Sequence, residues 1–82
     1  MPTNLSFEEW VMQGLKKDLP PDEFSKLALQ AKEEPEVVIE IFVDNLETLS
    51  NRYILATSKP HSVYSVAGVA KKLTENLSAC AV

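Results

Sequence analysis

The chain has few of the residues that enzymes and metal sites need. Its 82 residues include two glycines, one cysteine and one histidine. A phosphate-binding loop needs several closely spaced glycines, so Gly14 and Gly68 cannot form one. A single cysteine excludes a disulfide within the chain, and Cys80 with His61 cannot supply the paired ligands of a zinc site. We therefore expect no cofactor and no metal.

Catalysis is not indicated either. A nucleophilic enzyme needs a Ser, Thr or Cys side chain beside a base such as histidine. His61 and Cys80 stand at the two ends of the last predicted helix, and these ends lie about 20 to 25 Å apart. The acidic cluster at 33–40 lacks the Asp- and Gly-rich loop pattern of a calcium site. The sequence therefore predicts a protein that is not an enzyme.

No apolar run approaches the roughly 18 residues of a membrane-spanning helix, and no signal-peptide pattern is present. We therefore expect a cytoplasmic protein with no membrane contact. The composition, 45% hydrophobic and 24% charged, is that of a folded domain. We expect one helical domain over residues 1–82, with mobile ends at 1–5 and 79–82.

Capping signals predict two short helices near the N-terminus. Ser6, followed three residues later by Glu9, is typical of a capping box. The residue before Pro20 is disfavoured in a helix, so the first helix ends there. Pro20 and Pro21 then open a second helix. Gly14 weakens the first helix by about 1 kcal/mol relative to alanine, and we expect it to permit close packing.

Two apolar stripes at helical spacing predict two further helices. The first stripe, in a helix from about Pro35 to Thr57, consists of Ile39, Phe42, Leu46, Leu49 and Tyr53. The second, in a helix capped by Thr57 or Ser58 that ends near Leu77, consists of Val63, Val66, Ala70, Leu73 and Leu77. The short break at 58–61 predicts a turn between them. The fold class is therefore all-α, a four-helix arrangement with two short N-terminal helices packed on a long antiparallel helical hairpin.

Residues 36–43 also fit a strand, because they are rich in β-branched side chains. Alternation would place Val37, Ile39, Ile41 and Val43 on one face of that strand. The helix is favoured because the first apolar stripe continues unbroken out of this segment. Residues 52–57 are the only candidate for a second strand to pair with it. The sequence alone leaves both interpretations open.

The apolar residues outnumber those that a small four-helix core can cover. Leftover apolar faces indicate self-association or docking to another protein. The predicted dimer or partner interface consists of Val37, Val38, Ile41 and Val69. Our first hypothesis is a small non-catalytic interaction or regulatory protein that acts by binding another protein, with a homodimer expected.

Charge is distributed unevenly along the chain, and this distribution supports an alternative function. Residues 1–47 carry eleven acidic and four basic side chains, whereas residues 48–82 carry one acidic and four basic. Two helices joined by a short turn also form the skeleton of a DNA-reading motif. The alternative is therefore a dimeric nucleic-acid-binding regulator, and its candidate face consists of Arg52, Lys59, His61, Tyr64, Lys71 and Lys72. A remoter possibility is that the acidic half competes for a basic surface on another protein.

Overall fold

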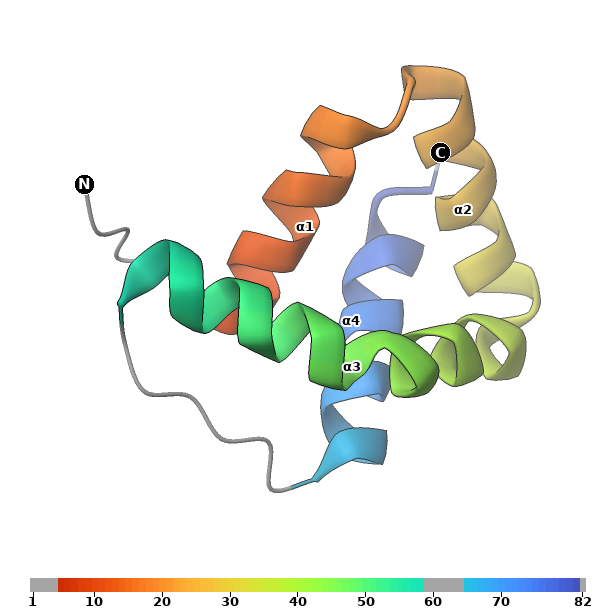
Figure 1. Ribbon diagram of the computed structural model, residues 1–82. Coiled ribbons are helices and arrows are strands. Elements are labelled where there is room, and N and C mark those ends of the chain that lie inside the picture. Colours follow the sequence, from red (N-terminus) through yellow and green to blue (C-terminus); the bar gives the residue numbers. More distant parts are fainter. Residues whose placement is uncertain (1–4, 59–64, 82) are drawn as a thin grey trace.

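The structure is a computed structural model that describes residues 5–58 and 65–81, and Figure 1 shows four helices there. They are α1 (Phe7–Asp18), α2 (Pro21–Glu33), α3 (Pro35–Thr57) and α4 (Val66–Ala79). No residue in the described ranges belongs to a strand. The prediction of an all-helical fold with four helices is confirmed, and residues 36–43 are helical.

The first three helices begin where local signals predict. Glu9 N donates to Ser6 Oγ at 3.2 Å, and Ser6 N donates to Glu9 Oε1 at 3.3 Å, which completes the capping box of α1. Pro21 and Pro35 occupy the first turns of α2 and α3. Proline is tolerated there because first-turn N–H groups have no intrahelical partner.

The fourth helix begins later than predicted. Ser65 caps it, and its Oγ accepts a hydrogen bond from Gly68 N at 3.2 Å. The prediction that Thr57 or Ser58 caps α4 is wrong. Thr57 is a buried residue of α3 whose Oγ1 donates to the Tyr53 carbonyl. Ser58 ends α3 in the left-handed region, with φ of 57°. The remainder of the predicted turn lies outside the described residues.

The two helices of the predicted hairpin, α3 and α4, cross each other. In Figure 1, α3 passes across α4 instead of running alongside it. The 23 residues of α3 give it a length of about 34 Å, which matches the longest dimension of the fold, 34 Å. Every pair of helices is in contact, but α4 packs most extensively against the others, against α2 nearly as much as against α3. The central element is therefore α4.

One apolar cluster joins all four helices. The inward face of α4 is fully buried, with Ala70, Leu73 and Leu77 each 0% exposed. The other helices supply Phe7, Val11, Met12, Ala31, Val38, Phe42, Leu46 and Tyr53. The first predicted stripe is confirmed, because its two remaining members, Ile39 and Leu49, pack against this cluster. The second is confirmed only from Ala70 onward, since Val66 is exposed and Val63 lies outside the described residues.

Tyr53 fixes α1 to the second half of α3. Its ring makes edge contacts with Phe7 and Trp10, with centroids 5.5 and 5.6 Å apart. Its hydroxyl donates to the Leu5 carbonyl at 2.8 Å, and Cys80 at the other end packs against the core. The described parts of the two predicted mobile ends therefore contact the fold.

Replacing Leu73 with alanine should destabilise the fold strongly. Leu73 lies on the buried face of α4, so Leu73→Ala leaves a cavity among three neighbouring helices. We expect the free energy of unfolding to fall by about 2 to 5 kcal/mol. Urea unfolding followed by circular dichroism measures it. Leu55→Ala is the matched control, because Leu55 is 83% exposed and its truncation should change stability by about 0.5 kcal/mol or less. Equal losses in the two variants would contradict the central placement of α4.

Candidate functional site

A groove lies where α3 meets α1 and α2. Two adjoining hollows, of about 240 and 280 Å³, have four lining residues in common: Leu15, Phe42, Leu49 and Arg52. They therefore form one continuous depression, called here the α3 groove. Leu27 and Ile41 line one end of it, and Trp10 and Gly14 line the other.

The groove follows from the crossing of the helices. Helices that cross at an angle pack tightly near the crossing and diverge beyond it. Leu15 of α1, Leu27 of α2 and Leu49 of α3 each remain partly exposed there while packing against the core. The groove is therefore lined mainly by apolar side chains that this chain covers only in part.

Gly14 opens the α1 end of the groove. A Cβ atom built on Gly14 meets no heavy atom within 4 Å beyond its own helix and chain neighbours. The expectation that Gly14 permits close packing is therefore wrong, because nothing approaches it. Glycine in a helix interior is destabilising, and at this position the fold shows no packing gain in return.

Positive charge surrounds the same end. Arg52 is exposed and forms no ion pair within 5–58 and 65–81. Lys16, Lys17 and Asp18 line an adjoining hollow that also includes Trp10 and Gly14. Three cations therefore accompany one anion here, in a chain whose net charge is −4.

The predicted interface on α3 is exposed only in part. Val37 and Ile41 lie one turn apart and are 41% and 45% exposed. They form what is called here the α3 edge, and Ile41 also belongs to the α3 groove. Val38 is 0% exposed, because neighbouring helical positions point about 100° apart, and Val69 packs partly buried against the core. Val38 and Val69 are therefore not available as open interface residues.

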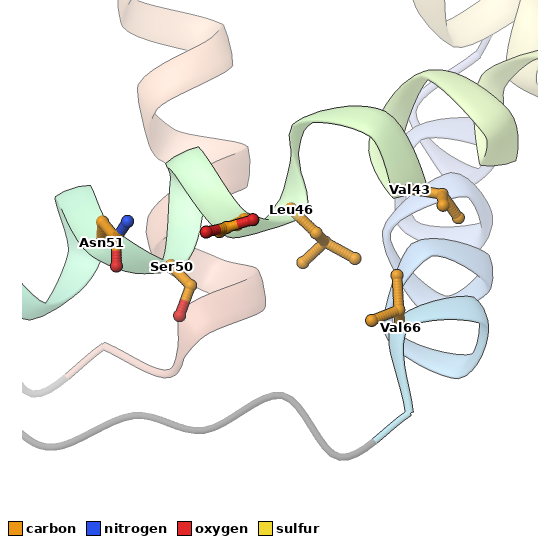
Figure 2. A pocket seen from close by; sticks show the side chains of 6 residues that line it. Val43, Leu46, Ser50, Asn51 and Val66 are labelled. Atoms are coloured by element: carbon orange, nitrogen blue, oxygen red, sulfur yellow. The ribbon is translucent and has the colours of Figure 1, made fainter.

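A separate hollow, of about 330 Å³, lies between α3 and α4. Figure 2 shows Val43 of α3 and Val66 of α4 reaching toward the same space near Leu46. Val43 and Val66 are both partly exposed. Sequence periodicity did not find this pair because each residue belongs to a different helix.

The predicted nucleic-acid face is divided among separate surfaces. Arg52 lines the α3 groove, whereas Lys71 lines a different hollow that also contains Glu36 and Glu75. Lys72 is exposed on α4. The other three candidates, Lys59, His61 and Tyr64, lie outside the described residues. Among the described residues, Arg52 lines the α3 groove while Lys16 and Lys17 line the hollow that adjoins it, an arrangement that the sequence did not predict.

The described residues contain neither a membrane-spanning helix nor a cluster of potential metal ligands. No helix there combines the length and apolar character needed to cross a bilayer. The same residues bring no three His, Cys, Asp or Glu side chains together as a potential metal site. Comparison with protein-family models, with curated proteins and with solved structures finds no match to this chain.

The two glycines should respond oppositely to substitution by alanine. Gly14→Ala places a methyl group in open space, so it should raise the free energy of unfolding by about 0.5 to 1 kcal/mol. At Gly68 the new Cβ would lie 2.8 Å from Ser65 Oγ, which caps α4, so Gly68→Ala should give no gain. Thermal and urea unfolding of both variants measure the difference. No gain in Gly14→Ala would contradict the assignment of Gly14 as unpacked, and an equal gain in both variants would contradict the close contact at Gly68.

Proposed function

We propose that this chain is a small non-catalytic interaction or regulatory protein that acts by binding another protein through the α3 edge and the α3 groove. The observation that carries the proposal is the continuity of these two surfaces through Ile41, which is 45% exposed and lines the groove. Val37 extends the apolar surface by one turn of α3.

The composition of this surface supports the proposal. Protein interfaces have an apolar centre, and Trp, Met and Arg are enriched in them. The α3 groove has leucine and phenylalanine side chains at its centre and polar groups such as Asn45 and Thr48 beside them. Trp10 and Arg52 lie at its α1 end, and tryptophan and arginine are among the residue types that most often dominate binding energy.

Charge substitution at the α3 edge tests the proposal. Ile41→Asp places a carboxylate where an apolar partner would cover it, so partner affinity should fall by about tenfold or more. Ile41 is already 45% exposed, so the free energy of unfolding should change by about 1 kcal/mol or less. Leu29→Asp is the matched control, because Leu29 on α2 is equally exposed and lines neither the groove nor the edge.

The measurement uses affinity-tagged wild-type, Ile41→Asp and Leu29→Asp proteins in a lysate of the source cells. Sedimentation of each purified chain, with a mass of 9.1 kDa, is run in parallel to detect a second copy as the partner. We expect a protein, or a second copy, that binds the wild type and Leu29→Asp and is lost with Ile41→Asp. Equal recovery by all three folded proteins, with unchanged sedimentation, would contradict the proposal.

A further inference from the structure

We infer that the α3 groove receives one amphipathic helix of a different protein, whose apolar edge is flanked by acidic residues. The inference rests on the proposed function, because it specifies the kind of partner that the same surface would bind. It is carried by the length of the groove, the charge around it and the open space at Gly14.

The shape of the groove suits a helix. Along α3 it extends from Ile41 to Arg52, which is about 16 Å or three helical turns. A helix that docks through positions i, i+3 or i+4, and i+7 presents its apolar edge over a comparable length. Leu15, Leu27 and Leu49, on three different helices, line the groove and provide the apolar contact for such an edge.

The charge around the groove indicates the flanking residues of the partner. Arg52 and Asp18 line the groove itself, and the exposed Lys16 and Lys17 line the adjoining hollow that shares Trp10, Gly14 and Asp18 with it. Three cations and one anion therefore border this end. Complementary charge across an interface accelerates association and selects the partner. An acidic flank on the docking helix would meet these cations.

The same charge disfavours a second copy as the occupant. A twofold-symmetric interface places the same patch on both copies. A dimer whose twofold axis passes near the α1 end of the groove would bring Arg52 of one copy toward Arg52 of the other. Like charges facing each other oppose association, so the groove is better matched to a different, acidic chain.

Gly14 supplies the third observation. The glycine destabilises α1 without permitting any close contact, and it lines both the groove and the adjoining basic hollow. A larger side chain at this position would project into that space. The absence of a side chain therefore leaves the α1 end of the groove free for a docking helix.

The test uses two designed helical peptides of about 18 residues with the same leucine edge. The acidic peptide carries glutamates on both flanks, and the basic peptide carries lysines at the same positions. Anisotropy of a peptide-borne dye measures binding. The emission of Trp10, the sole tryptophan, reports contact at the groove.

We expect the acidic peptide to bind the wild type and the basic peptide to bind about fivefold or more weakly. Arg52→Glu should weaken the acidic peptide about fivefold, whereas Arg52→Lys, which keeps the charge, should not. Lys32→Glu is the remote control, because Lys32 lies outside the groove on α2. Gly14→Leu should abolish binding and leave the helicity intact, because leucine is a stronger helix former than glycine.

Three results would overturn the inference. Equal binding of the two peptides with no effect of Arg52→Glu would exclude the acidic partner, and undiminished binding to Gly14→Leu would exclude the groove. A dimer that Gly14→Leu dissociates would show that a second copy fills the groove. The proposed function can fail independently of this inference. It is supported if Ile41→Asp loses a protein partner that Gly14→Leu still binds. It is contradicted if both variants still bind every partner of the wild type.

Discussion

The fold depends on the burial of one face of α4. Ala70, Leu73 and Leu77 are completely buried, and the helix that carries them packs against the other three more extensively than any other helix does. A chain of this size buries a smaller fraction of its surface than a larger domain does. Placing one short helix at the centre lets a few side chains serve three packing surfaces at once. The longer α3 is then free to cross the assembly, with only one side covered.

The exposed apolar residues follow from that arrangement. The apolar residues at the start of α3 surround nearly the whole helix, and one side of it faces the core. Val38 and Phe42 are buried on that side, while Val37, Ile41 and Val43 remain more than one third exposed. The uncovered surface therefore results from one mostly apolar helix crossing the fold with a single side covered, and Ile41 on that surface also lines the α3 groove.

Local signals predicted the helices well because each acts within a few residues. The capping box at Ser6, the prolines that open α2 and α3, and the five-residue stripe of α3 are each patterns within one helix. The start of α4 was wrong because Ser58 resembles an N-cap in sequence yet takes the left-handed conformation that ends α3. The crossing of α3 and α4 depends on which faces meet across the core, and single-helix periodicity contains no such information. The same limit hid the groove, because Leu15, Leu27 and Leu49 come from three helices.

Gly14 is a residue whose presence the packing of the fold does not explain. Within α1 the glycine lowers helix stability, and no neighbour approaches closely enough to require it. Natural chains depart from the locally best residue most often where function constrains them. The unpacked Gly14 lines the α3 groove together with Arg52, which forms no ion pair within 5–58 and 65–81. Two features that packing within the described residues does not require therefore meet at one place, and the docking surface proposed above would account for both.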